Sequence, residues 1–107
     1  MKVLPDESVP RRLASFFPEP LTLRTVQEMG WAGTPNGLLL SRAAAENFKA
    51  LVTVDRGIEH QQNISALPIS IIIMLAPRNR LAELQPLVPK VVSLLSVCLE
   101  KRIYHVT

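Results

Sequence analysis

The only two aspartates of this 107-residue chain, Asp6 and Asp55, each follow directly after a stretch that is typical of a buried strand. These stretches are KVLP at 2–5 and ALVTV at 50–54. Carboxylates that crowd together repel each other unless a cation neutralises them, and a hard divalent cation with oxygen ligands does this well. Such a cation can activate water and stabilise a phosphoryl transition state. The two aspartates therefore suggest a metal site.

Other polar residues accompany the two aspartates. Asn36 is expected in the first turn of a helix, and Glu7 directly follows the first aspartate. Arg11 and Arg12 fall in the first turn of another helix, where the helix dipole disfavours cations. A phosphate bound beside the acids would explain these arginines, and an exposed helix face is the simpler alternative. An aspartate after a strand can also be a plain turn former.

Alternating strands and helices position these residues. This pattern predicts a three-layer α/β/α sandwich with a mostly parallel sheet, right-handed crossovers and all strand carboxyl ends at one edge. Ligands bind outside that edge in such sheets, so the two aspartates, Glu7 and Asn36 are expected to converge there. The expected strands are 2–5, 21–26, 50–54, 68–75 and 102–106, and the expected helices lie between Ser8 and Pro18 and at 35–47, 80–85 and 87–99.

The composition predicts one globular domain, 1–107, with 48% hydrophobic and 20% charged residues. A net charge of +3 permits a nucleic-acid partner, but only a clustered basic patch would argue for one. A single cysteine, Cys98, excludes a disulfide within the chain and fits a reducing cytoplasm. The apolar runs are too short to span a bilayer, so we expect no membrane association.

Several residues are left without a firm role. His60 and His105 have no partner at metal-ligand spacing. Trp31 is more readily explained as a loop anchor than as a base-stacking residue. Whether Gln61, Gln62 and Asn63 line a site or coat a loop stays open. The chain has no glycine loop for phosphate and no nucleophile–histidine–acid triad.

Four stretches carry a resemblance to a known family: MKVLPDESVPRRL, RTVQEMGWAG, LVTVDRG and PISIIIMLAPRNRL. In this order and spacing they resemble the small stand-alone PIN-like proteins that are assigned as toxin components of toxin–antitoxin systems. The resemblance implies a PIN-like α/β/α fold and a Mg²⁺- or Mn²⁺-dependent ribonuclease with an acidic cluster, restrained by an antitoxin protein.

The resemblance also implies particular acidic positions. The first acid of the family falls on Asp6, and the acid of its T-x-D pattern falls on Asp55. Relatives often carry acids at the start of the middle helix, where this chain has Asn36 and Leu38, and a second acid after T-x-D, where it has Gly57. The chain therefore keeps the two ends of the cluster and lacks negative charge between them.

Three functions follow as hypotheses. The first is a ribonuclease in which Asp6 and Asp55 hold the metal and Asn36 assists. Glu7 and Glu28 are accessory acids in this hypothesis. The residues expected to hold RNA are Arg11, Arg12 and Arg56. In the second, the missing acids leave a catalytically weak or silent binding module that acts through an antitoxin-like partner or a homodimer. The third, a phosphoacceptor receiver domain, ranks low because Ala76-Pro77 follow the fourth strand where a receiver has Ser or Thr.

Overall fold

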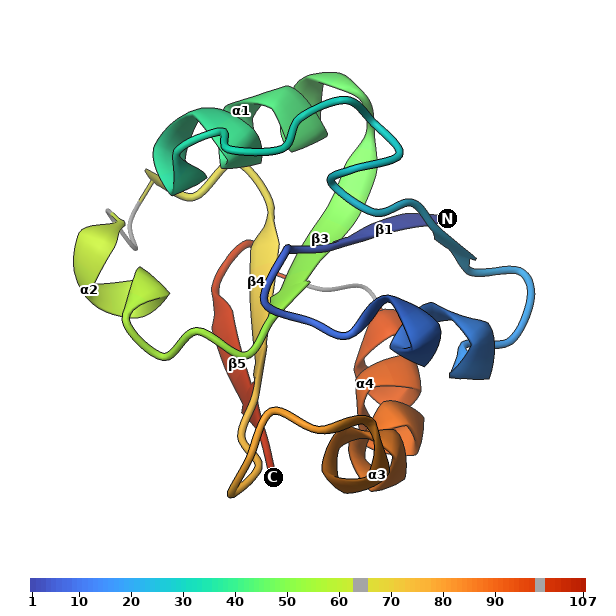
Figure 1. Ribbon diagram of the computed structural model, residues 1–107. Coiled ribbons are helices and arrows are strands. Elements are labelled where there is room, and N and C mark those ends of the chain that lie inside the picture. Colours follow the sequence, from blue (N-terminus) through green and yellow to red (C-terminus); the bar gives the residue numbers. More distant parts are fainter. Residues whose placement is uncertain (63–65, 98–99) are drawn as a thin grey trace.

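The computed structural model describes residues 1–62, 66–97 and 100–107, so the expectations for Asn63 and Cys98 lie outside it. Five parallel strands form one sheet in the order β2-β1-β3-β4-β5 (Figure 1). The strands are β1 (Lys2–Pro5), β2 (Thr22–Leu23), β3 (Phe48–Thr53), β4 (Ser70–Met74) and β5 (Ile103–Val106). The helices are η1 (Arg11–Phe16), α1 (Asn36–Ala45), α2 (Ile58–Gln61), α3 (Leu81–Leu84), η3 (Gln85–Leu87) and α4 (Val88–Leu95).

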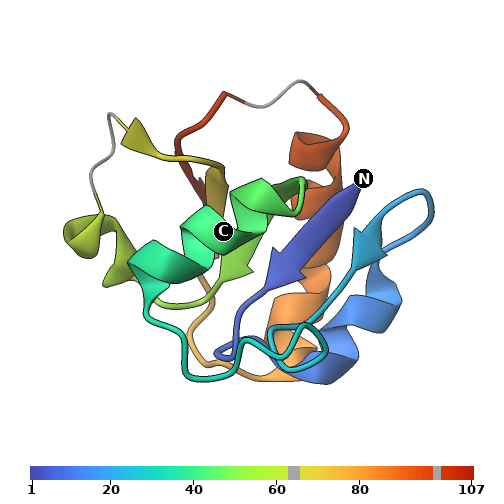
Figure 2. The same ribbon diagram turned by 90° about the horizontal axis from the view of Figure 1, so that it is seen from above.

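Helices cover both faces of the sheet, which confirms the expected three-layer sandwich (Figures 1 and 2). Alternate residues of each central strand face opposite layers. Leu51 and Ile71 pack with α1 and with Ile58 of α2, whereas Val52 and Ile72 pack with η1, α3 and α4. The strand β4 is buried at every position, as expected for a strand covered on both faces.

One crossover departs from the expected hand. The connections from β3 to β4 and from β4 to β5 move in the same direction across the sheet but cover opposite faces, so they cannot both be right-handed. Packing explains the exception, because η1 buries only Leu13 within its six residues. Without α4, the apolar residues Val52, Ile72 and Met74 would lack most of their covering layer.

The strand β2 is shorter than the expected strand at 21–26. Thr25 and Glu28 exchange hydrogen bonds between side chain and backbone, with Thr25 N donating to Glu28 Oε1 (3.0 Å) and Glu28 N to Thr25 Oγ1 (3.1 Å). This reciprocal pair is the arrangement of a capping box, and it turns the chain out of the sheet. Conversely, the short helix α2 lies in the stretch 56–67 that the sequence predicts to be irregular.

Helix ends respond to proline as expected. The stretch Gln85–Leu87 around Pro86 is a 3₁₀ turn that separates α3 from α4. The first helix, η1, is also a 3₁₀ helix and begins directly after Pro10. Among the helices of the described ranges, none is long and apolar enough to cross a membrane.

Pro5 ends β1 at little cost to the sheet. In a parallel strand, successive N–H groups point to the two neighbours in turn. Asp6 N donates to Val52 O of β3 (2.9 Å), so the nitrogen of Pro5 faces β2. The N–H that proline lacks would therefore point toward β2 and not toward β3, so no bond to β3 is lost. The pairing of β1 with β2 itself ends at Val3 and Leu23.

Candidate functional site

Asp6 lies at the carboxyl end of β1 with both carboxylate oxygens engaged. Oδ1 accepts hydrogen bonds from Ser8 N (3.0 Å) and Ser8 Oγ (2.5 Å), and Oδ2 accepts one from Thr53 Oγ1 (2.6 Å). Burial raises the pKa of Asp6 above its ordinary value, against the lowering effect of these bonds. The charge of Asp55 raises this pKa further, so the two carboxylates interact electrostatically.

Two hydroxyl groups join the loops that carry the acids. Thr53 is fully buried, and its Oγ1 lies 3.2 Å from Ser8 Oγ. Asp55 N donates to Thr53 Oγ1 (3.0 Å), and Val54 N donates to Ser8 Oγ (3.2 Å). The loop after β1 and the loop after β3 are therefore fastened side by side, as the position of each acid directly after a strand predicts.

Asp55 is the more exposed acid. It turns the chain into α2, since Gly57 N donates to Asp55 Oδ1 (2.9 Å). A Cβ at Gly57 would stand 3.2 Å from that oxygen, so an acidic side chain here would crowd Asp55. The glycine therefore belongs to the turn that presents the second aspartate.

The acid pair lies where the sheet topology reverses. The chain leaves β1 toward β2 over one face and returns from β2 to β3 over the other. The neighbouring strands β1 and β3 are therefore followed by segments that continue to opposite faces of the sheet. In open α/β sheets this reversal creates the crevice in which ligands bind. Asp6 and Asp55 follow these two strands.

Asn36 reaches the loop of Asp55 through Gln61. It begins α1, and its Nδ2 donates to Gln61 Oε1 (3.2 Å). Gln61 Nε2 in turn lies 3.9 Å from the position that a Cβ atom would occupy if Gly57 had a side chain. Asn36 thus lies at the expected edge, and Gln61 fixes its amide.

The two accessory acids have other partners. Glu7 Oε1 accepts a hydrogen bond from Gly33 N (2.9 Å), which holds the loop before α1. Glu28 belongs to the capping box with Thr25. The hydrogen bond from the Thr25 backbone N–H lowers the pKa of Glu28 most, and the bond with the Thr25 side chain lowers it further. Smaller contributions come from the charges of Arg24 and Arg11. The described residues contain no cluster of three or more acidic, histidine or cysteine ligands.

The predicted RNA-binding arginines lie on the loops and the helix around the acid pair. Arg11 and Arg12 are exposed on η1, which follows the loop of Asp6. Arg56 follows Asp55, and its Nη2 donates a long hydrogen bond of 3.5 Å to Ala76 O. In the described part of the chain the ion pairs are Arg24–Glu28 and His105–Glu59, so none of these three arginines is paired with an acid.

The sequence reasoning missed three residues of this site. Ser8 has the signature of a helix cap, yet its hydroxyl donates to Asp6 and accepts from Val54 N. Thr53 is part of the T-x-D pattern, which is the signal that could have found it. Asn79, which directly precedes the N-cap residue of α3, donates its Nδ2 to Ser8 O and ties a third loop to the site.

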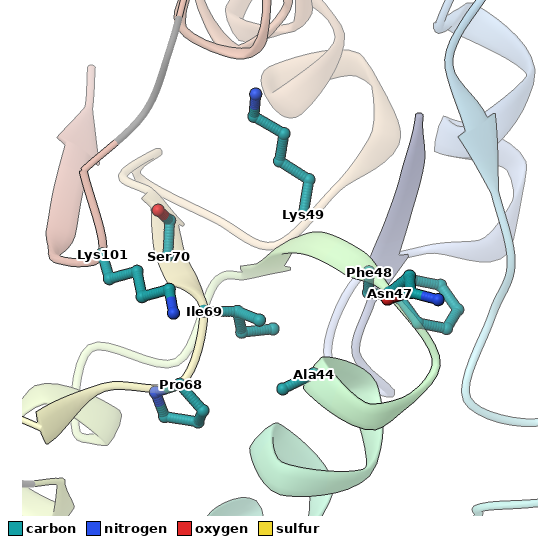
Figure 3. Close-up of a pocket in the computed structure, with 8 residues that line it drawn as sticks. All are labelled: Ala44, Asn47, Phe48, Lys49, Pro68, Ile69, Ser70 and Lys101. Carbon is teal, nitrogen blue, oxygen red and sulfur yellow. The ribbon is translucent and has the colours of Figure 1, made fainter.

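A cavity of about 450 Å³ lies at the opposite edge of the sheet, beside the amino ends of β3 and β4. Its lining includes Lys49, Ser70 and Lys101, but the two lysine side chains point apart (Figure 3). Ser70 Oγ is occupied, because it donates to Glu100 O (2.7 Å). This hollow therefore lacks the converging polar groups of a reactive site.

Comparison with known proteins adds no family to this description. No protein-family model matches the chain, and neither a curated protein nor a solved structure matches it at a significant level.

Proposed function

We propose that this chain is a PIN-like, Mg²⁺- or Mn²⁺-dependent ribonuclease, acting as a toxin component that an antitoxin protein restrains. One observation carries the proposal: the Asp6 carboxylate and the Asp55 backbone N–H bond to the same Thr53 hydroxyl, at the point where the sheet topology reverses, and the Asp55 charge raises the pKa of Asp6. Paired carboxylates at such a crevice match a divalent cation that acts on phosphate.

The oxygen atoms of the pair fit a partly hydrated cation. Each carboxylate oxygen has two lone-pair sites. Oδ1 of Asp6 already accepts two hydrogen bonds, and its Oδ2 and the Oδ1 of Asp55 accept one each from the described residues. Lone pairs therefore remain on three of the four carboxylate oxygens, and Mg²⁺ commonly keeps several waters beside one or two carboxylates.

Each residue then has a role. Asp6 and Asp55 would hold the cation, which supplies a more acidic water and neutralises negative charge on a phosphodiester. Ser8 and Thr53 keep the Asp6 carboxylate in one orientation. Asn36 contributes a neutral amide near the reacting phosphate, and Arg11, Arg12 and Arg56 bind neighbouring phosphates of RNA.

A second function has an observation of its own. Among the described residues, no group of three or more acidic, histidine or cysteine side chains could hold a metal ion, so Asp6 and Asp55 lack a third ligand of this kind. Loss of charge from a site lowers its affinity for a divalent cation. A catalytically silent PIN-like module, acting through an antitoxin-like partner or a homodimer, is therefore the competing proposal.

Single substitutions of the aspartates distinguish the two functions. In Asp55→Asn and Asp6→Asn we expect Mn²⁺ affinity to fall, and RNA cleavage to fall by about 100-fold or more, because even outer-shell changes cost up to about that much. Calorimetric titration measures binding, and a fluorescent mixed-sequence RNA reports cleavage.

Glu46→Gln is the matched control, because Glu46 is an exposed acid beyond the far end of α1. It should bind Mn²⁺ and cleave RNA as the wild type does. Cleavage that survives in both aspartate variants would refute the ribonuclease. Weak or undetectable Mn²⁺ binding by the wild type, together with no RNA cleavage, would support the silent module instead.

A further inference from the structure

The loop between β4 and α3 is fixed against both loops that carry the acids. Asn79 Nδ2 donates to Ser8 O in the loop of Asp6, and Arg56 Nη2 reaches Ala76 O at 3.5 Å from the loop of Asp55. Arg78 N donates to Glu83 Oε2 (2.7 Å), which ties the same loop to α3. Asn79 thus holds the segment 76–80 against the loop of Asp6, and Glu83 holds it to α3.

This segment contributes two further cations. Arg78 and Arg80 flank Asn79, and both are exposed. Within the described ranges, neither guanidinium forms an ion pair. The helix α3 that follows packs beside η1, so the loop of Arg78 and Arg80 adjoins the helix of Arg11 and Arg12.

We define the arginine rim as Arg11, Arg12, Arg56, Arg78 and Arg80, which come from the segments that follow β1, β3 and β4. These are five of the eight arginines of the chain. Guanidinium groups bind phosphate through paired hydrogen bonds and stay charged, so arginine suits phosphate recognition better than lysine does. The rim comes from segments at the same edge of the sheet as Asp6 and Asp55, and in the described part of the chain it forms no ion pair with these two acids.

We propose that Arg78 and Arg80 form a second phosphate-binding segment for single-stranded RNA, beside Arg11 and Arg12 and next to the loop of Asp6. The inference rests on the proposed function for the identity of the polyanion. Asn79 acts as a positioning residue, because its bond to Ser8 O fixes both arginines relative to Asp6.

Salt dependence tests this inference without catalysis. Binding of a fluorescent single-stranded RNA is measured by anisotropy in EDTA over a series of KCl concentrations. Each phosphate contact contributes about 0.7 to the slope of log affinity against log salt for single strands. Arg78→Ala/Arg80→Ala should therefore reduce the magnitude of the slope by about 1.4. The charge-preserving variant Arg78→Lys/Arg80→Lys should keep most of the slope.

Lys101→Ala/Arg102→Ala removes the same charge from the opposite edge and is the control. It should leave the slope near that of the wild type, and thermal melting verifies that all variants fold. An unchanged slope in Arg78→Ala/Arg80→Ala, an equal loss in the control, or no RNA binding by the wild type would overturn the inference. Failure of the ribonuclease proposal would appear separately, as RNA cleavage that survives in both Asp6→Asn and Asp55→Asn.

Discussion

The two edges of the sheet differ in how their polar groups are arranged. At the carboxyl edge, Asp6, Ser8 and Thr53 bond to one another, and Asn79 joins them from a third loop. At the amino edge there is a hollow of about 450 Å³, but the side chains of Lys49 and Lys101 diverge (Figure 3). Converging groups, rather than the volume of a hollow, are what a reactive site requires.

The basic residues follow the same division. The arginine rim comes from segments that follow the carboxyl ends of β1, β3 and β4. Three of the four lysines, Lys2, Lys49 and Lys101, instead lie at or next to the amino ends of β1, β3 and β5. Lysine is a flexible, strongly hydrated charge that suits a solvated surface, and arginine forms directed pairs with phosphate. The net charge of +3 conceals this difference, because it counts both edges together.

The largest expected effect compares buried hydroxyls at the two edges. Thr53→Val removes the donor to Asp6 and the acceptor of Asp55 N, which should cost about 1–3 kcal/mol of unfolding free energy. Ser70→Ala removes one bond to Glu100 O, a carbonyl that also accepts from Tyr104 OH, and should cost about 0.5–1.5 kcal/mol. Urea denaturation measures the unfolding free energy of both variants. An equal or larger loss of stability in Ser70→Ala than in Thr53→Val would contradict the expectation that the carboxyl edge has the more tightly bonded hydroxyl.

A smaller effect should come from adding a charge at each edge. Asn36→Asp introduces a carboxylate beside the Asp55 loop, and we expect Mn²⁺ affinity to rise about tenfold, because ligand charge tunes affinity for divalent cations. Asn47→Asp makes the same change beside the hollow of the amino edge, at a position whose φ of 64° suits either residue. It should leave Mn²⁺ affinity unchanged. Equal gains in both variants would show a nonspecific charge effect.

The smallest effect concerns pH. The pKa of Asp6 in the folded protein is raised above its ordinary value of 3.8, chiefly by burial. Between 3.8 and the raised pKa, the folded state holds a proton that the unfolded state has released, so stability falls as pH rises through this window. Asp6→Asn should remove that decline, whereas Glu46→Gln should keep it. Urea unfolding at a series of pH values measures it, and parallel curves for wild type and Asp6→Asn would refute the assignment.

Much of the fold is predictable from the sequence because local patterns and tertiary packing agree. The buried run 68–75 contains β4, and the break at Pro86 separates α3 from α4. The short β2 was not predictable from its β-branched residues, because the capping box of Thr25 and Glu28 outweighs them. The unusual hand of the crossover from β4 to β5 depends on which face of the sheet still lacks a covering helix layer. That is a property of the whole sheet and not of a local sequence pattern.

The candidate site was predictable in part for a similar reason. The position of Asp6 and Asp55 directly after strands is enough to bring them to one edge of a parallel sheet. The roles of Ser8 and Asn79 depend on contacts between loops that are 71 residues apart in sequence, and no local pattern encodes them. Glu28 illustrates the opposite case, since its local bonds to Thr25 already account for it.

The hand of the last crossover also has a consequence for the order of folding. The layer of α1 and α2 is assembled from one continuous stretch between β2 and β4, so its contacts close short loops. The opposite layer joins η1, near the beginning of the chain, to α3 and α4, near its end. Contacts of such long sequence separation form late, because the entropy of closing a long loop must be overcome first. The layer that carries four of the five rim arginines, on η1 and before α3, is therefore expected to be the last to form.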